Sequence, residues 1–170
     1  MKLKSILLLI ILSTCMSLTV YAQSNADITT FILVRHAEKM DDSADPDLSP
    51  EGYARAERLA EMLQNVDFDA VYSTARIRTM ETVRMVAEKN ELEIENYDAG
   101  EPDENSRLWL DKHTGETVLI SGHSNTTPFF ANALLGYEYY PDKFDESDYG
   151  NLLIITVAPD GSRKIIPLRY

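Results

Sequence analysis

Short apolar runs that alternate with amphipathic segments constrain the fold of this chain more than any other feature of its sequence. Residues 29–34, 68–73 and 117–121 read as strands, because they are short and rich in residues that favour strands. Helical patterns follow these runs, with apolar residues repeating on one face. This order predicts an α/β fold, with a mostly parallel central sheet and helices on both faces in three α/β/α layers.

The first predicted helix has a clear start signal. Ser49 suits the N-cap, and Pro50 suits the first turn. Apolar residues then recur at helical spacing from Ala56 to Leu63. The other elements expected before the C-terminus are a helix over 76–89, a short strand over 93–96, a polar loop over 98–106 and a helix over 127–136. Two last strands, 152–157 and 164–168, flank a turn sequence and predict a C-terminal hairpin.

The first 22 residues have the order of a secretory signal. Lys2 and Lys4 precede the apolar stretch 6–12, and a small-residue ending closes at Ala22. A membrane anchor is the alternative, but the apolar stretch falls short of the roughly 20 residues that a bilayer span needs. We therefore expect a signal peptide over 1–22, and a protein exported to the periplasm or secreted.

Cys15 is the only cysteine, and it lies inside the predicted signal. A lipoprotein signal ending at Cys15 ranks lower, because Thr14 is a poor match for the small residue expected there. Signal removal would leave 148 residues without a disulfide or a thiol nucleophile, so an apolar core must stabilise the fold. That length is enough for a single domain over 23–170.

The chain is acidic, with a net charge of −12 that becomes −14 once Lys2 and Lys4 are removed with the signal. Such a surface repels polyanions, so nucleic acid and anionic membranes are not expected partners. A small anion could still bind where arginines gather locally. The expected partner is therefore a small molecule.

Polar residues follow three of the predicted strands at the point where each ends. Arg35 and His36 end the first, Arg76 and Arg78 follow the second, and His123 follows the strand over 117–121. In open α/β sheets, ligands bind in the crevice beyond the carboxyl ends of the strands. Two of the three histidines and three arginines are therefore expected at one crevice.

Two kinds of site fit these residues poorly. Zinc needs three or four N, S or O ligands, and the neighbouring arginines would oppose a divalent cation. A serine hydrolase would use the segment 122–126 as a nucleophile elbow, but Thr126 replaces its last glycine. That enzyme class also needs a histidine after the nucleophile Ser124, and none follows position 123. Neither a metal nor another cofactor is expected.

Phosphoryl transfer to histidine fits the same residues better. An arginine offers a planar fork of donors that binds phosphate bidentately. Arginines and a second histidine around an attacking imidazole would stabilise the negative charge of the transition state. Because imidazole is partly neutral near pH 7, it attacks without a strong base. The cluster therefore indicates a site for a phosphorylated substrate.

Four segments resemble the histidine phosphatase superfamily, the phosphoglycerate-mutase-like group of branch 1 type. LVRHAEK (33–39) resembles its R-H-G/A signature, and DLSPEG (47–52) resembles its helix start. YSTARIRTMET (72–82) resembles its arginine segment, and SGHSNT (121–126) resembles its second-histidine motif. The four segments occur in the family order and extend over most of the predicted mature chain.

The resemblance implies a role for each matching residue. His36 is the expected nucleophile, Arg35 an expected phosphate ligand, and His123 a donor to the phosphoryl oxygens. Arg76 and Arg78 compete for the second arginine, since two residues apart on a helix they would point about 200° from each other. The threonine four residues after the family arginine matches Thr82, which selects Arg78.

One part of the family pattern is short in this chain. Larger members carry a glutamate general acid in a long stretch after the second helix, to protonate the leaving oxygen. We expect Glu101 in that role, with Asp98 and Glu104 as rivals, although an acidic surface loop explains these residues equally well. Without an acid, phosphoramidates, acyl phosphates and aryl phosphates would be favoured substrates.

The expected function is that of an exported, metal-independent phosphatase of the histidine acid phosphatase type. It would hydrolyse phosphomonoesters or related phosphoryl compounds through a phosphohistidine on His36. A phosphoglycerate-mutase-like phosphotransferase and a non-catalytic phosphate-binding module are the alternatives. His113 is expected on the surface, and residues 137–149 are expected to form a packed surface loop, with a lid over substrate as the alternative.

Overall fold

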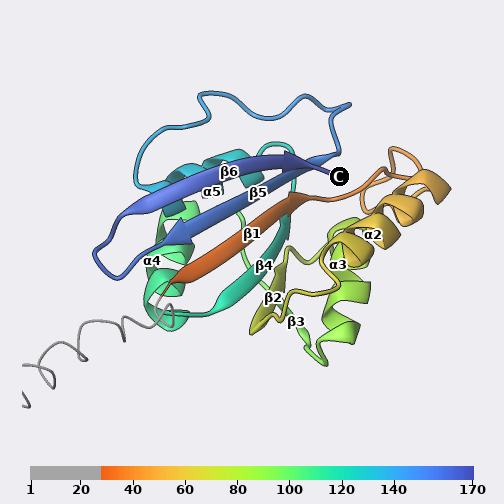
Figure 1. Ribbon diagram of the computed structural model, residues 1–170. Helices are drawn as coiled ribbons and strands as arrows, with labels where there is room; N and C mark the ends of the chain where they lie inside the picture. The colour runs from red at the N-terminus through yellow and green to blue at the C-terminus, as the bar shows by residue number, and fades with distance from the viewer. Residues whose placement is uncertain (1–27) are drawn as a thin grey trace, which may run out of the picture.

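The computed structural model describes residues 28–170, so the predicted signal peptide lies outside the described residues. Figure 1 shows a central sheet with two pairs of helices. The strands are β1 (Thr29–Arg35), β2 (Ala70–Ser73), β3 (Ile94–Asn96), β4 (Thr117–Gly122), β5 (Asn151–Val157) and β6 (Arg163–Arg169). The helices are α2 (Pro50–Met62), α3 (Ile77–Lys89), α4 (Pro102–Lys112) and α5 (Thr127–Leu135). The α/β class is confirmed.

The six strands form one mixed sheet in the order β3-β2-β4-β1-β5-β6. Strands β1 to β4 are parallel, and β5 and β6 form the predicted antiparallel hairpin at one edge. Strand β1 lies inside the sheet, where Phe31 is beside Val118 of β4 and Ile155 of β5. All partners of β1 therefore come from far later in the chain.

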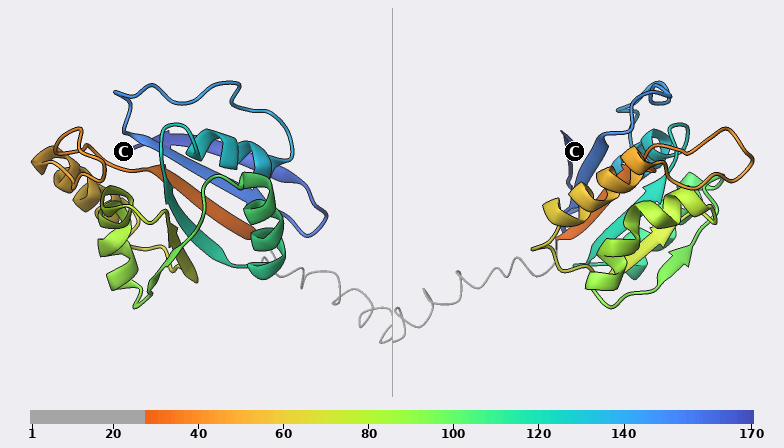
Figure 2. Two further views of the ribbon diagram at one scale, coloured as in Figure 1. Left: turned by 180° about the vertical axis from the view of Figure 1, so that it is seen from behind. Right: turned by 90° about the vertical axis from the view of Figure 1, so that its right-hand side faces the viewer.

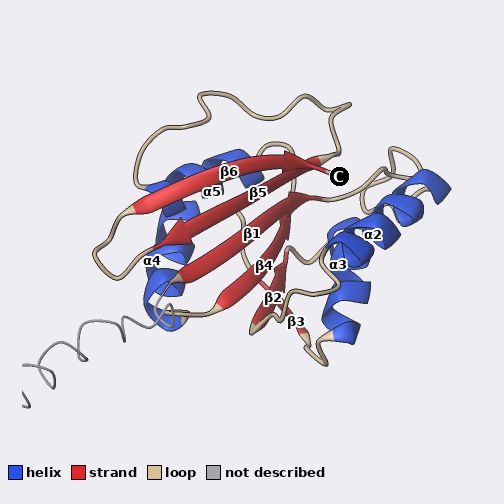
Figure 3. Ribbon diagram, viewed as in Figure 1, coloured by secondary structure: helices blue, strands red, loops and turns tan. Residues whose placement is uncertain are grey.

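Helices cover both faces of the sheet, as Figures 2 and 3 show. The side chains of β1 point alternately to the two faces of the sheet, because successive side chains of a strand point in opposite directions. Ile32 and Val34 pack in one apolar cluster with residues of α2 and α3, and Phe31 and Leu33 pack in another with residues of α4 and α5. The three layers are thus as predicted. Among residues 28–170, each helix is too short or too polar to cross a bilayer.

Helix α2 starts as the sequence indicates. The Ser49 hydroxyl accepts a hydrogen bond from the Gly52 backbone at 3.2 Å, and Pro50 occupies the first turn. A Cβ atom at Gly52 would lie 2.3 Å from the Glu38 carbonyl oxygen, which is closer than any side chain allows. Glycine at this position therefore lets the start of α2 pack directly on the segment that follows β1.

Two helices differ from the prediction. Helix α3 begins at Ile77, and Arg76 before it is extended, with φ −131° and ψ 139°. Helix α4 was wrongly predicted as part of a polar loop. Only Ser106 and Trp109 of α4 are buried, so no apolar stripe marks the helix in the sequence. Its anchor is the Trp109 ring, which stacks on Tyr72 of β2 with centroids 4.0 Å apart.

Candidate active site

The strand order places three polar segments at one edge of the sheet. Strand β4 lies between β1 and β2, with Arg35 beside Gly122 and Ser73 beside Ser121. The His36 backbone N–H donates to the Gly122 carbonyl at 2.9 Å, which continues the contact beyond the end of β1. The residues that follow β1, β2 and β4 therefore emerge side by side.

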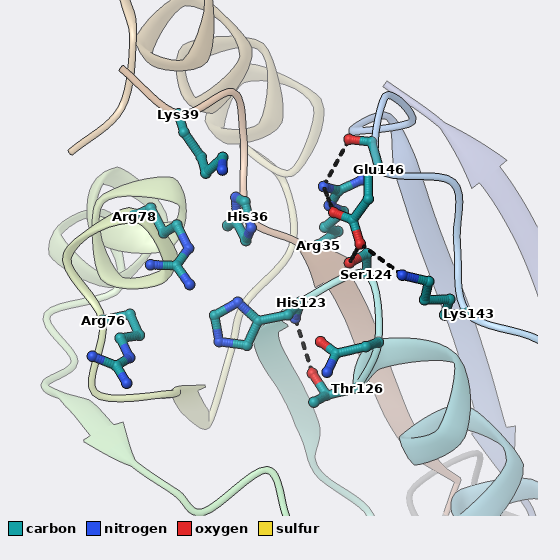
Figure 4. Close-up of a pocket in the computed structure, with 11 residues that line it drawn as sticks. Arg35, His36, Lys39, Arg76, Arg78, His123, Ser124, Thr126, Lys143 and Glu146 are labelled. Atoms are coloured by element: carbon teal, nitrogen blue, oxygen red, sulfur yellow. Dashed lines mark hydrogen bonds and ion pairs between the residues drawn. The ribbon is translucent and has the colours of Figure 1, made fainter. Parts of the chain in front are cut away.

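A cavity of about 450 Å³ opens at this edge. Arg35, His36, Arg78 and His123, which the sequence assigns to the site, all line it (Figure 4). Figure 4 shows the two imidazoles between the arginines of the 74–78 segment and the Glu146 side. The other lining residues are Lys39, Arg76, Ser124, Asn125, Thr126, Lys143 and Glu146.

The His36 imidazole is held through its Nδ1 atom. Nδ1 lies 2.7 Å from the Ala37 carbonyl oxygen, which can only accept, so Nδ1 carries the proton and Nε2 is left with its lone pair. The Ala37 backbone N–H donates to Thr82 Oγ1 at 2.9 Å, so α3 supports the same segment. Burial, together with His123, Arg35 and Arg78, lowers the pKa of His36 to about 3, although the bond to Ala37 opposes this. The imidazole is therefore neutral over a wide pH range.

The second imidazole, His123, faces the first with ring centroids 5.4 Å apart. Its Nε2 atom lies 2.9 Å from Thr74 Oγ1, and its backbone N–H donates to Thr126 Oγ1. Burial lowers the pKa of His123 to about 4, and the positive charges of Arg78, Arg76 and Arg35 act in the same direction. Both histidines are thus neutral near pH 7.

Arg35 is fully buried and binds mainly to the loop between α5 and β5. Its Nη1 group donates to the carbonyls of Asp145 and Asp148, and Nη2 donates to the carbonyl and a carboxylate oxygen of Glu146, at 2.7–3.1 Å. The guanidinium carbon lies 4.1 Å from the Tyr149 ring centroid. Only Nε is buried without a partner, so Arg35 can offer a phosphate one donor rather than a fork.

Arg78 has more of its donors free. Nη1 makes one long contact, 3.4 Å, with Asp45, and Nε is buried without a partner. Burial and the positive charge of Arg76 lower the pKa of Arg78, and Asp45 opposes the shift. A cation held near another cation and away from water favours the arrival of an anion.

Arg76 also lines the cavity, so the expectation that its side chain points away from that of Arg78 is wrong. The 200° argument assumes that both residues are helical. Because Arg76 is the extended residue before α3, its side chain is free of that constraint and lies on the same side of the cavity as Arg78 (Figure 4).

The three candidate acids lie away from His36. Glu101 precedes α4 as its N-cap residue, and Glu104 lies in the first turn of that helix. Neither lines the cavity. Asp98 lines a neighbouring hollow that shares Arg76 and His123 with the cavity, and its Oδ1 accepts a hydrogen bond from the Gly100 backbone. The structure therefore does not bring Glu101 together with the other predicted residues.

Glu146 is the carboxylate that the structure adds to the cavity. It accepts hydrogen bonds from the Ser124 hydroxyl at 2.8 Å, from Lys143 at 3.3 Å and from Arg35. The bond from Ser124 is the main cause that lowers the pKa of Glu146, so the group stays ionised. Residues 137–149 were assigned to a surface loop, and the one available signal was their mixture of acidic and aromatic residues.

His113 is buried, contrary to the prediction of a surface residue. Its Nε2 atom lies 3.0 Å from the Tyr72 hydroxyl, and Nδ1 lies 2.6 Å from the Glu116 carboxylate. It does not line the cavity. Within residues 28–170, no three histidine, cysteine or carboxylate side chains gather closely enough to hold a metal ion.

One family model matches part of this chain. Residues 31–99 match the model of the histidine phosphatase superfamily (branch 1). The resemblance seen in the sequence is therefore confirmed, over the segment that carries Arg35, His36, Arg76 and Arg78. No curated protein sequence matches the chain.

Several solved structures share the fold of this chain at low sequence identity. The protein histidine phosphatase SixA in complex with tungstate is 17% identical with TM-score 0.67, covering 82% of this chain and 96% of its own. A phosphoserine phosphatase from Entamoeba histolytica bound to 3-phosphoglyceric acid is 17% identical with TM-score 0.64, covering 84% and 97%. A phosphoglycerate mutase from Bacillus anthracis is 15% identical with TM-score 0.63, covering 85% and 94%. The fold of these three structures thus extends over most of this chain.

Proposed function

We propose that this protein is a phosphatase that hydrolyses phosphorylated small molecules through a phosphohistidine on His36. The observation that carries the proposal is the state of His36 itself. Its Nδ1–H is held by the Ala37 carbonyl, which leaves Nε2 neutral and unprotonated beside Arg78 and His123. An imidazole in this state is a competent nucleophile toward phosphorus.

In the first step, His36 Nε2 attacks phosphorus in line with the bond to the leaving group. The new N–P bond forms as the P–O or P–N bond to the leaving group breaks, and that atom keeps the bonding pair. Arg78, His123 and the Nε donor of Arg35 bind the three equatorial oxygens, where charge accumulates in the transition state.

In the second step, a water molecule attacks the phosphohistidine. The N–P bond breaks, the electron pair returns to His36 Nε2, and inorganic phosphate leaves. The proton lost by the water passes to the phosphate or to solvent, so the enzyme returns to its starting state.

The leaving group is expected to depart without strong acid assistance. Glu146 is the only carboxylate that lines the cavity among the described residues, and its hydrogen bonds keep it ionised as an acceptor. An ionised carboxylate cannot protonate a departing oxygen. We therefore favour aryl phosphates, acyl phosphates and phosphoramidates over alkyl and sugar phosphates as substrates.

The low pKa of His36 supports activity under mildly acidic conditions, as the acid phosphatase type requires. An ordinary imidazole, with a pKa near 6.5, would be mostly protonated at pH 5 and unable to attack. A pKa of about 3 leaves His36 neutral at that pH. The predicted export to the periplasm or the medium remains part of the proposal, and its test is the N-terminal sequence of the protein recovered outside the cytoplasm.

The decisive experiment is to trap the intermediate. The purified chain, mixed with p-nitrophenyl phosphate and quenched in alkali, which preserves phosphohistidine, should carry phosphate on His36. Tandem mass spectrometry distinguishes His36 from His123 and from His113, which serves as an internal control because it lies away from the cavity. The variant His36→Asn should lose at least about a thousandfold in turnover, as expected for a lost nucleophile.

Retained activity in His36→Asn, or label on another residue, would refute the mechanism. A mutase would instead move the phosphate within one substrate, which nuclear magnetic resonance of phosphorus detects as isomerisation without release of inorganic phosphate. A binding module would bind inorganic phosphate but turn over neither p-nitrophenyl phosphate nor any member of a broad phosphomonoester panel.

A further inference from the structure

The cavity contains more positive charge than one phosphoryl group needs. Five of its eleven lining residues are arginine or lysine, and one is acidic, in a chain whose net charge is −12. The proposed mechanism uses only Arg35 and Arg78 of these five. The remaining cations, Lys39, Arg76 and Lys143, have no role in the chemical steps.

Arg76 differs from Lys39 and Lys143 in its ion pairing. Lys39 pairs with Asp42 at 2.8 Å, and Lys143 pairs with Glu146 at 3.3 Å. Within residues 28–170, the Arg76 side chain makes no hydrogen bond and no ion pair, although its charge acts on both Arg78 and His123. A cation left unneutralised at the edge of an anion site lowers the energy of any second negative group placed there.

Arg76 also borders a second hollow of about 490 Å³, next to the cavity. Arg76 and His123 line both spaces, so a substrate whose phosphoryl group lies at His36 can extend past Arg76 into this hollow. The other residues around it are Thr74, Ala75, Asn96, Tyr97, Asp98 and Ala99. The hollow is therefore large enough and near enough to take the leaving group of such a substrate, with Arg76 bordering both spaces.

We infer that Arg76 is a specificity residue, which binds a second anionic group, a carboxylate or a phosphate, on the leaving-group side of the substrate. The inference depends on the proposed function only in placing the phosphoryl group beside His36. The Asp98 carboxylate, which also lines the hollow, acts against the second anion, and one of its oxygens already accepts a hydrogen bond from the Gly100 backbone.

Non-hydrolysable phosphonates test the inference without any need for turnover. The matched pair is 3-carboxyphenylphosphonate and 3-carbamoylphenylphosphonate, which have nearly the same shape and differ by one charge. Calorimetry on the intact protein should show that the carboxylate binds roughly five- to tenfold more tightly, as expected for a partly exposed charge-assisted contact. 1,3-Benzenediphosphonate distinguishes a second phosphate from a carboxylate as the preferred group.

Three variants assign the preference to Arg76. Arg76→Gln should reduce the ratio of the two dissociation constants to about one, and Arg76→Lys should retain part of it. Asp98→Asn should raise the ratio, because it removes the opposing charge. Arg84→Gln is the matched control, since Arg84 lies further along α3, lines neither the cavity nor the hollow, and pairs with Glu81 and Glu88.

Equal affinity of the wild-type protein for the charged and neutral phosphonates would overturn the inference. So would a preference that persists in Arg76→Gln. Both results leave the phosphohistidine proposal intact, because trapping of phosphate on His36 tests that proposal separately. Conversely, absence of label on His36 together with the predicted phosphonate ratios would refute the catalytic mechanism and keep Arg76 as an anion-binding residue.

Discussion

One side of the cavity, here called the strand-end wall, consists of His36, Arg78 and His123 on backbone that the sheet and α3 hold. The opposite side, the loop wall, presents Lys143 and Glu146 from the loop between α5 and β5. Side chains of the strand-end wall are positioned by contacts with buried backbone, such as His36 with Ala37. The Glu146 side chain of the loop wall is 64% exposed.

This difference between the two walls shows where side chains must be positioned precisely. Groups that transfer a phosphoryl group must hold their geometry closely, and rigid elements supply that. The loop wall contributes Lys143 and Glu146 to the cavity, and in the described part of the chain no hydrogen bond joins either side chain to His36. Arg35 joins the two walls, because it leaves the end of β1 and donates to three carbonyls of the loop. Arg35 therefore mainly holds the loop in place and leaves only one donor for a phosphate.

The largest effect expected in this comparison comes from Arg78. Arg78→Ala should lower turnover of p-nitrophenyl phosphate by about a hundred- to a thousandfold, because it removes the main fork for the transition-state charge. The free energy of unfolding should change by less than about 1 kcal/mol, since Asp45 is its only partner and the contact is long. Denaturant unfolding and steady-state kinetics measure both. A loss of stability as large as the loss of activity would contradict this assignment.

Arg35 should show the reverse pattern. Arg35→Met keeps much of the volume but leaves the carbonyls of residues 145, 146 and 148 without their donor, so the free energy of unfolding should fall by about 3 kcal/mol. Cleavage by a non-specific protease should become faster within the loop. If the variant keeps its stability and loses only phosphate affinity, Arg35 is a phosphate ligand and the loop is held by other contacts.

The strand-end wall should also make stability depend on pH. The pKa values of His36 and His123, about 3 and 4, lie below the ordinary value of about 6.5 that an unfolded histidine has. The unfolded state therefore binds more protons as the pH falls below 6.5, and the folded state loses stability, by about 2 kcal/mol for each histidine between pH 7 and 5. Unfolding by urea at several pH values measures this slope. His36→Asn should remove about half of the slope that the two histidines cause, and an unchanged slope would show that His36 titrates normally.

The smallest effect is expected from the loop wall. Glu146→Gln should change turnover of p-nitrophenyl phosphate by no more than about twofold, because an exposed carboxylate contributes little to the fixed geometry of the site. It should increase the affinity for inorganic phosphate by about two- to threefold at low salt, since one negative charge beside the anion is removed. Isothermal titration measures the change. A large loss of turnover would instead assign Glu146 a direct part in the chemistry.

The strand-end wall could be predicted from the sequence to a large extent. Apolar runs that end in Arg35-His36 and Gly122-His123 mark both the strands and the edge at which ligands bind, and these two segments lie side by side as expected. Helix boundaries were harder, because a shift of one residue at Arg76 changes the direction in which its side chain points. If Arg76 were helical, its side chain would point away from the cavity. Its backbone is extended, so the side chain lines the cavity instead.

The loop wall and α4 could not be predicted in the same way. Arg35 and Ser124 hold Glu146 at the cavity, and no local spacing connects position 146 with position 35 or 124 in the sequence. Helix α4 buries a single large side chain, Trp109, so it lacks the repeated apolar face by which helices are recognised. The burial of His113 could not be predicted either, because it depends on hydrogen bonds between its ring nitrogens and the side chains of Tyr72 and Glu116.

The central place of β1 has a consequence for how the molecule is made. A ribosome releases β1 early, yet its first neighbour in the sheet, β4, starts at Thr117, and the second, β5, starts at Asn151. Pairings between such distant segments form slowly. The loop that carries His36 therefore stays unorganised until nearly all of the chain has been synthesised.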